Sequence, residues 1–225
     1  MADLYDVAHF ETGAYRRNAT FLEDPEFSRA LDCFVKGCAD VLLQDESTGE
    51  ILIGHRIVHP QPAWWFVGGR MRVGDTPQQS AARNVMRETR LDLAPSRFLG
   101  VCATSMLWQK RKQEPAGNGT GDIALTLLVR ITPAERAAID FHPAEYDQLM
   151  WVTPEALVTG EQYHPALRRA AQHVGSRKAY EALEAAVQSG ADAAAVAAAA
   201  KKFVGLQHAA RAMGDLPVPF VDLPQ

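Results

Sequence analysis

Short apolar runs divide the first 130 residues of the chain into predicted strands. Residues 41–44, 50–54 and 123–129 are rich in Val, Ile and Leu, and residues 98–103 form a fourth run. Runs of this length between turn residues are typical of buried strands. The polar segment 45–49 separates the first two runs, so we expect them to form a β-hairpin.

The segment that ends at Thr89 has a helical pattern instead. Its apolar side chains fall three and four residues apart, at Ala81, Ala82, Val85 and Met86. Asp75 or Thr76 is suited to cap this helix, and Pro77 suits its first turn. Strands mixed with a helix in this order predict an α/β fold, an α/β/α sandwich around a mixed sheet.

The last part of the chain is predicted to be helical. Residues 165–174 and 176–188 have helical patterns, and Gly190 ends the second. The alanine-rich segment 192–213 favours helix but has little side chain to bury. We therefore expect an added helical segment at the C-terminus.

These patterns predict three parts in a chain long enough for one full core. Residues 1–30 would be an N-terminal extension and residues 31–165 the central domain. Residues 166–225 would form a helical extension that packs on the domain or on the partner of a homodimer.

Composition narrows the classes of partner and compartment. The chain has 225 residues, a net charge of −4 and a pI of about 6.0, so no basic excess indicates nucleic acid or an anionic membrane. No signal peptide or apolar stretch of about 20 residues is visible, and a cytoplasmic protein is expected. Cys33, Cys38 and Cys102 form no metal motif and are expected to be buried, reduced thiols.

The segment 68–91 carries the clearest chemical motif. Gly68 and Gly69 are followed by Asp75, Arg83 and Glu88. Adjacent glycines adopt backbone angles closed to other residues and let a ligand approach the main chain. Arg83 is expected to pair with Asp75 and hold the loop on the helix.

This motif resembles the Nudix box, which is a glycine, five residues, a glutamate, seven residues, then Arg-Glu-apolar-any-Glu-Glu-any-Gly-apolar. The matching positions are Gly69, Arg83, Val85, Glu88 and Leu91. Asp75 stands for the first glutamate, whereas Asn84, Arg87 and Arg90 depart from the pattern. The resemblance implies a Nudix hydrolase with the same sandwich fold.

The departures change the expected metal chemistry. Residues 84, 87 and 88 share one helix face, which in an ordinary Nudix helix carries three carboxylates for several Mg²⁺ ions. Here Glu88 is the one carboxylate left on that face. Mg²⁺ usually takes one or two carboxylates with water and phosphate, so one metal is expected and a cluster is not.

Several segments resemble a divergent Nudix branch, the GDP-mannose mannosyl hydrolases. They are residues 21–27, 52–56, 64–70, 98–101 and 151–157. The resemblance implies one Mg²⁺, or Mn²⁺ in its place, held by Gly69, Glu88 and Glu145.

The same resemblance implies which residues contact a nucleotide-sugar. Arg70 would lie against the diphosphate, and Asp40 and Arg83 occupy further binding positions. His59 stands where the branch has an arginine. Arg87 either pairs on the surface with a carboxylate or contacts phosphate directly.

The position of the general base in this branch is Tyr146 here, which joins Arg70 and Glu88 as a candidate catalytic residue. An unperturbed tyrosine has a pKa near ~10 and is a poor base at neutral pH. The candidate replacements are the loop histidines His59, His142 and His164.

Two further features have alternative interpretations. Trp64 and Trp65 either stack on a nucleobase or belong to the core. The glycine-rich loop 110–122 carries Lys110-Arg111-Lys112 and is either a lid that brings positive charge to the diphosphate or a solvated hairpin loop.

Three functions follow from these observations. The first is a Mg²⁺-dependent Nudix hydrolase that splits a nucleoside diphosphate-sugar such as GDP-mannose into nucleoside diphosphate and sugar. The second is a pyrophosphatase that attacks phosphorus. The third is a catalytically inactive Nudix module that binds a nucleotide.

Overall fold

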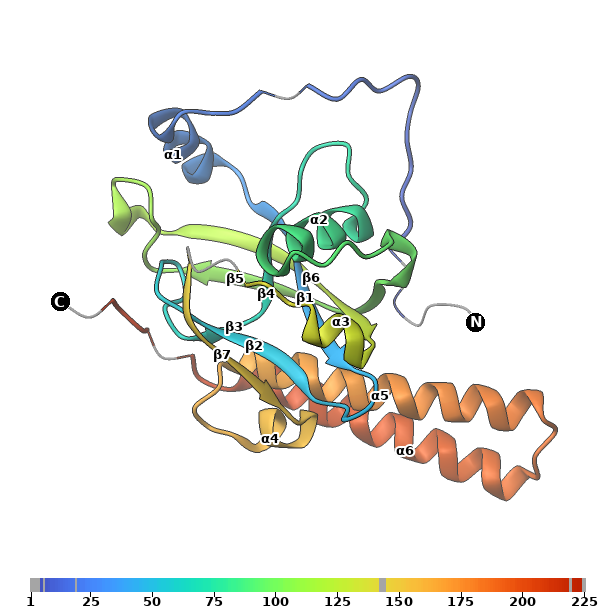
Figure 1. Ribbon diagram of the computed structural model, residues 1–225. Helices are drawn as coiled ribbons and strands as arrows, with labels where there is room; N and C mark the ends of the chain where they lie inside the picture. Colours follow the sequence, from blue (N-terminus) through green and yellow to red (C-terminus); the bar gives the residue numbers. More distant parts are fainter. Residues whose placement is uncertain (1–4, 6, 19, 142–144, 219, 224–225) are drawn as a thin grey trace.

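The computed structural model describes residues 5, 7–18, 20–141, 145–218 and 220–223. Within these residues a seven-stranded mixed sheet forms the centre of the molecule (Figure 1). The strands are β1 (Lys36–Asp45), β2 (Ile51–Arg56), β3 (Trp64–Trp65), β4 (Val67–Arg70), β5 (Leu99–Trp108), β6 (Thr120–Ile131) and β7 (Tyr146–Val152).

Strand β1 is the hub of the sheet. The order is β3-β2-β1-β6-β5, with β4 paired to β1 and β7 paired to β2. β1 and β6 are parallel, and β1 is antiparallel to β2, with Leu43 opposite Leu52. The predicted hairpin is therefore confirmed, and the four predicted strands correspond to β1, β2, β5 and β6, although Glu50 and Phe98 lie just before β2 and β5.

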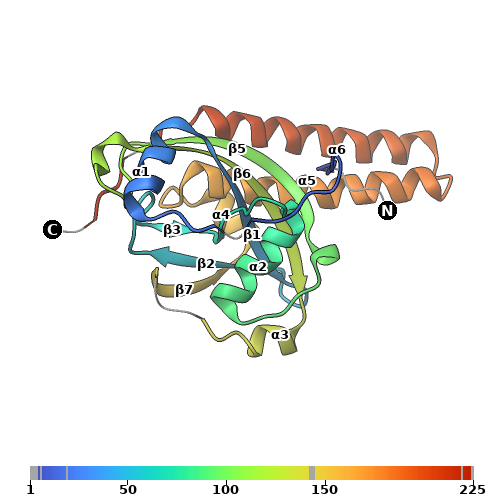
Figure 2. The ribbon, with the colours of Figure 1, turned by 90° about the horizontal axis from the view of Figure 1, so that it is seen from above.

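Helices cover both faces of this sheet. They are α1 (Asp24–Cys33), α2 (Pro77–Thr89), α3 (Pro133–Ala137), α4 (Pro154–Thr159), α5 (Pro165–Gln188) and α6 (Ala193–Ala212). Short 3-10 turns occupy Pro95–Arg97, Ala116–Asn118 and Met213–Asp215. Figure 2 shows α2 in front of the sheet, while Figure 1 places α4, α5 and α6 on the opposite face.

The alternation of side chains along β1 separates two cores. Val41 and Leu43 pack with Val85 of α2, whereas Leu42 packs with Leu157 of α4 and Leu167 of α5. All six are fully buried, because successive strand residues point to opposite faces and helices cover both faces. The α/β/α sandwich predicted from the sequence is confirmed.

Helix α2 begins and ends as local chemistry dictates. The Thr76 hydroxyl accepts from the Gln79 amide at 3.1 Å, and Gln79 Oε1 accepts from the Thr76 amide at 2.8 Å. This capping box satisfies two amide donors at the helix start. The helix ends at Arg90, which has a left-handed φ of 61°. Of the two residues expected to cap this helix, Asp75 and Thr76, it is Thr76 that does so.

Helix α5 is one 24-residue helix rather than the two predicted segments. Its first three turns bury small and branched side chains against the sheet: Ala166, Leu167, Ala170, Ala171 and Val174. This packing offsets the cost of about 1 kcal/mol for a glycine inside a helix, at Gly175. The segment predicted as an added extension therefore starts inside the sandwich.

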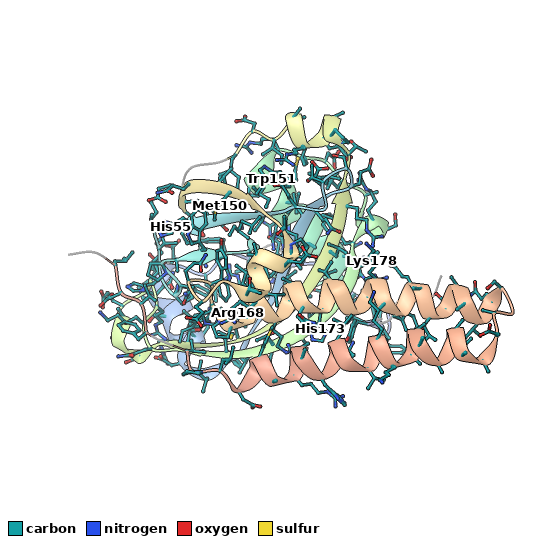
Figure 3. All side chains as sticks on the ribbon, turned by 90° about the horizontal axis from the view of Figure 1, so that it is seen from below. His55, Met150, Trp151, Arg168, His173 and Lys178 are labelled. Atoms are coloured by element: carbon teal, nitrogen blue, oxygen red, sulfur yellow. The ribbon has the colours of Figure 1, made fainter. Side chains whose placement is uncertain are left out.

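Helix α6 lies beside α5 (Figure 3), and the pair extends past the edge of the sheet (Figure 1). Ala210 is the one residue of α6 that is buried. The added C-terminal helices are as predicted, while the domain limits at 30 and 165 and the homodimer stay predictions.

The structure also bears on the predictions about membrane spans and cysteines. Among the residues described, none of the helices combines the length and apolar character that crossing a membrane requires. All three cysteines are free thiols, but contrary to the expectation that all are buried, only Cys102 is buried, while Cys38 is half-buried and Cys33 is exposed. It lies in the last turn of α1, whose apolar face is narrow. The cytoplasmic location stays a prediction.

Replacing Leu167 by Ala tests whether the start of α5 belongs to the core. The variant removes a fully buried side chain, so we expect a loss of roughly 2–5 kcal/mol in the free energy of unfolding. Val187 on the same helix is 59% exposed and is the matched control, with an expected change within about 0.5 kcal/mol. Urea unfolding measures both, and equal losses would refute the assignment.

Candidate functional site

A cavity of about 370 Å³ opens beside α2 and the glycine strand β4. Residues from α1, α2 and all seven strands of the sheet line it. Its lining includes Phe21, Phe27, Lys36, Asp40, Arg56, Gly68, Gly69, Arg70, Arg72, Arg83, Arg87, Trp108, Asp122, Glu145 and Tyr146.

The cavity is strongly cationic. Its described lining carries six cationic side chains, Lys36, Arg56, Arg70, Arg72, Arg83 and Arg87, and three carboxylates, Asp40, Asp122 and Glu145. Four of the cations have carboxylate partners. Lys36 pairs with Asp122 at 2.9 Å, Arg56 with Glu145 at 3.2 Å, Arg83 with Asp75 at 3.2 Å, and Arg87 with Glu88. Arg70 and Arg72 have no carboxylate partner among the described residues. An anionic ligand is the natural complement.

The two glycines of β4 allow close packing at the base of the cavity. A Cβ on Gly68 would lie 2.7 Å from the carbonyl oxygen of Ala39 and from Asp40 Oδ1. Gly69 has φ of +154°, and its Cβ would lie 3.1 Å from Arg87 Nη2. A side chain at Gly68 would collide with the backbone of β1, whereas one at Gly69 would strain the backbone and displace the Arg87 guanidinium.

Asn84 joins these three elements. Its Nδ2 donates to the Ala39 carbonyl at 3.2 Å and to the Gly69 carbonyl at 3.0 Å. Its Oδ1 accepts from Arg83 Nη1 at 3.1 Å. The amide is fully buried with both amide hydrogens used, so this departure from the box has become a structural bridge.

Arg87 makes the corresponding contact one turn later. Its Nη2 donates to the Gly68 carbonyl at 3.1 Å and to Glu88 Oε1. The guanidinium therefore lies between the loop carbonyl and the helix carboxylate. Of the two predicted roles for Arg87, pairing with Glu88 is confirmed, and the side chain also lines the cavity.

Tyr146 contacts the other oxygen of Glu88. The phenol oxygen lies 3.0 Å from Glu88 Oε2 and 3.1 Å from the Phe66 carbonyl, and donates its single proton to one acceptor at a time. Burial, together with the Glu88 carboxylate, holds the pKa of Tyr146 well above its usual value. A phenol in this state suits the positioning of Glu88 and does not suit the role of general base.

The predicted metal ligands do not fit a metal ion in this arrangement. Both oxygens of Glu88 have protein donors, the Gly69 carbonyl accepts from Asn84, and Glu145 pairs with Arg56. No group of three or more His, Cys, Asp or Glu side chains in the described part of the chain is arranged to hold a metal. Magnesium at Gly69, Glu88 and Glu145 stays a prediction.

Asp40 is the buried carboxyl group of the cavity. It lies on β1 opposite Gly68 and is 7% exposed. Burial raises the pKa of Asp40 to about 7, an effect that Arg56 opposes and Asp122 and Glu88 reinforce. A carboxyl whose pKa lies near neutral pH can take up a proton there, as a general base must.

Arg83 holds the loop as expected. Its Nε lies 3.2 Å from Asp75 Oδ2, and its Nη2 lies 3.2 Å from the Arg70 carbonyl. The predicted pair with Asp75 is confirmed. Arg17 from the N-terminal segment also pairs with Asp75 and donates to the Gly74 carbonyl, which the sequence does not indicate.

The three histidines proposed as bases lie outside the cavity or outside the described residues. His59 pairs with Asp222 at 3.3 Å. His164 is buried, its Nδ1 accepts from the Ala166 amide, and burial lowers its pKa to about 4. His142 belongs to the segment that is not described.

The loop predicted as a possible lid uses two of its three cations for contacts within the protein. Arg111 is 2% exposed and contacts Asp32 at 2.7 Å and Ser28 at 2.7 Å. Lys110 pairs with Asp222.

The two neighbouring tryptophans differ in their surroundings. Trp65 belongs to the core, contacts Trp108 edge to face and also lines the cavity. Trp64 is absent from the described lining of the cavity.

Several cavity residues escaped the sequence analysis. Arg56, Arg72 and Lys36 are absent from the predicted site because no motif names them. Phe27 lies under the Arg70 guanidinium at 4.3 Å and falls in a segment that carried the family resemblance. The available signal was proximity in sequence, since Arg72 follows the glycines by three residues.

The chain matches one protein-family model over more than half of its length. The family model for the NUDIX domain matches residues 36–174, well over half of the chain. Enzymes of this family typically use a divalent metal ion and act on nucleotide-type substrates.

Solved structures resemble this chain at low identity and with TM-scores below 0.5. A C. elegans Ap4A hydrolase binary complex has 15% identity and a TM-score of 0.48, and the match covers 64% of this chain and 98% of that one. The MutT protein from Methanosarcina mazei Go1 has 16% identity and a TM-score of 0.47, and the match covers 61% and 91%. A bifunctional NMN adenylyltransferase/ADP ribose pyrophosphatase from Francisella tularensis, complexed with AMP and a Mn ion, has 18% identity and a TM-score of 0.39, and the match covers 62% and 39%. Identities this low carry no information about a shared substrate.

Replacing Asp40 by Asn tests the burial of this carboxyl group. An aspartate pKa of 3.8 in the unfolded chain and about 7 in the fold means that the folded protein binds more protons between these values. Stability of the wild type therefore falls as pH rises from about 4 to 7, while that of the variant lacks this contribution.

We expect the variant to be more stable by roughly 2–4 kcal/mol at pH 8 and equal to the wild type near pH 4. Urea unfolding at pH 4, 5.5 and 8 measures the difference. A difference that is independent of pH would contradict the raised pKa.

Proposed function

We propose that this chain, which belongs to the NUDIX domain family, is a hydrolase of nucleoside diphosphate derivatives. The favoured substrate class is a nucleoside diphosphate-sugar such as GDP-mannose. The observation that carries this proposal is the cationic cavity, in which Arg70 and Arg72 lack carboxylate partners among the described residues. A diphosphate supplies the missing negative charge, and guanidinium groups bind phosphate oxygens with paired donors.

The apolar part of the cavity supports a nucleotide rather than a free phosphate ion. Phe21, Phe27, Trp65 and Trp108 line it beside the cations. Flat aromatic surfaces suit a nucleobase or the apolar face of a sugar. The ring of Phe27 also supports the guanidinium of Arg70 from below, at 4.3 Å.

The proposed reaction is attack by water on the anomeric carbon of the sugar. The bond from that carbon to the diphosphate oxygen breaks, and the nucleoside diphosphate leaves with the electron pair. Arg70 and Arg72 stabilise the charge that builds on the leaving diphosphate. The Asp40 carboxylate accepts a proton from the attacking water, so the products are nucleoside diphosphate and free sugar.

Attack at phosphorus is less well supported by the site. Besides Glu88, the candidate carboxylates for such a reaction are Asp75 and Glu145. Asp75 is held by Arg83 and Arg17, and Glu145 by Arg56.

A binding module without turnover is the second candidate. The observation that favours it is the engagement of both Glu88 oxygens by Arg87 and Tyr146. Such a module would use the same cations for binding alone.

The experiment is anion-exchange chromatography of a nucleotide-sugar panel after incubation with the protein, in Mg²⁺ and separately in EDTA. We expect nucleoside diphosphate plus free sugar. Monophosphate plus sugar phosphate would instead establish attack at phosphorus. An unchanged panel with calorimetric binding would establish the binding module, and an unchanged panel without binding would refute both.

Replacing Asp40 by Asn separates catalysis from binding. We expect kcat to fall by about 100-fold or more, because the amide cannot accept the water proton. The dissociation constant of the nucleotide-sugar should change by less than about threefold. An unaltered kcat would exclude Asp40 as the base.

Replacing Arg70 by Ala tests the diphosphate contact. We expect nucleoside diphosphate binding to weaken by about tenfold or more in calorimetry, and the salt dependence of binding to decrease. The matched control is Arg29→Ala on α1, an exposed arginine outside the cavity lining, which should bind normally. Equal effects of the two substitutions would indicate a change in overall charge only.

A further inference from the structure

The geometry points to Arg87 as a built-in cation that takes the place of a divalent metal in this site. We propose that its guanidinium bridges the Gly68 carbonyl of β4 and the Glu88 carboxylate of α2 and also contacts the diphosphate of the ligand. This inference rests on the proposed function for the identity of the anion, while the exclusion of metal is independent of it.

The contacts of Arg87 are the ones that a bridging cation would make. Nη2 donates to the Gly68 carbonyl at 3.1 Å and to Glu88 Oε1. One positive group thus neutralises the buried Glu88 carboxylate and donates a hydrogen bond to the Gly68 carbonyl. A divalent ion at the same oxygens would meet the guanidinium at contact distance.

The second departure from the box acts in the same sense. At position 84 an amide donor replaces a carboxylate and binds the Gly69 carbonyl at 3.0 Å. Both glycine carbonyls therefore accept from helix donors. A ligand set for a metal consists of acceptors, whereas here the helix supplies donors at two of its three positions.

The charge of the helix face agrees with this interpretation. Asn84, Arg87 and Glu88 together carry no net formal charge. Nearby Arg83 and Arg70 add positive charge around the cavity. A divalent cation would have to enter a cationic cavity and displace a charge-assisted hydrogen bond, both at a cost in free energy.

Arg87 retains donors for a ligand. No acceptor among the described residues takes a hydrogen bond from its Nη1 or Nε, and the residue is exposed and lines the cavity. A guanidinium carries five N–H donors, and the protein contacts use those of Nη2. Two phosphate oxygens can therefore be bound by the remaining edge of the group.

The test counts bound Mn²⁺ by the loss of its free electron paramagnetic resonance signal. The proteins are wild type, Arg87→Ala, Glu88→Gln and the double variant. We expect Arg87→Ala to bind one more Mn²⁺ than the wild type does. The Mn²⁺ dissociation constant of that variant should be at least about tenfold lower than that of the wild type. The double variant should not bind the additional ion.

A comparison of the wild type with Glu88→Gln keeps Arg87 in place. This comparison therefore remains informative if Arg87→Ala fails to fold. We expect the same Mn²⁺ count in both. If Glu88→Gln removes one Mn²⁺ from the wild type, or if Arg87→Ala gains none, the proposed role of Arg87 is overturned.

Calorimetry with inorganic pyrophosphate in EDTA tests the anion contact. We expect the wild type to bind, Arg87→Ala to bind at least about tenfold more weakly, and Arg29→Ala to bind as wild type does. Binding that requires added Mg²⁺ would overturn the inference. Absence of pyrophosphate binding under both conditions would refute the phosphate contact and the proposed function, while the Mn²⁺ counts still decide whether Arg87 excludes metal.

Discussion

The site depends on the close approach of β1, β4 and α2 at the two glycines. Asn84 joins the three elements by donating to one carbonyl on β1 and one on β4. The β1 backbone leaves no room for a side chain at position 68, and the positive φ of Gly69 disfavours one at position 69. It also places Arg87 against Gly68 and Asp40 beside the cavity. A small change in this spacing would move the cation, the carboxyl and the loop together.

Two carboxyl groups beside these glycines, Asp40 and Glu88, are buried at a cost in stability. Asp40 is a buried carboxyl whose charged form is disfavoured by burial. Glu88 is also buried, and burial raises its pKa although Arg87 opposes the shift. Natural cores avoid such groups unless partners or function retain them. Glu88 has its partners in Arg87 and Tyr146, whereas Asp40 faces the cavity, where a ligand would complete its surroundings.

Local chemistry was readable from the sequence and distant contacts were not. Helix α2, its Thr76 cap and the pair between Arg83 and Asp75 follow from spacing within about ten residues. The contact of Arg17 with Asp75 spans 58 positions, and that of Tyr146 with Glu88 spans the same number. Gly175 misled the helix prediction because propensity cannot register the packing of the turns before it. The cationic cavity combines residues of nine helices and strands, and no single motif encodes it.

The degenerate box is consistent with a reassignment of its helix face rather than simple decay. Random loss of carboxylates would leave the glycine carbonyls and Glu88 without partners, which is costly for buried polar groups. Instead, each lost acceptor is replaced by a donor that reaches a loop carbonyl, and the remaining carboxylate is satisfied on both oxygens. The side chains of Asn84 and Arg87 hold the Gly68-Gly69 backbone in the position that a metal ion would otherwise organise. Such an arrangement is preorganised, because the cation is present before any ligand enters the cavity.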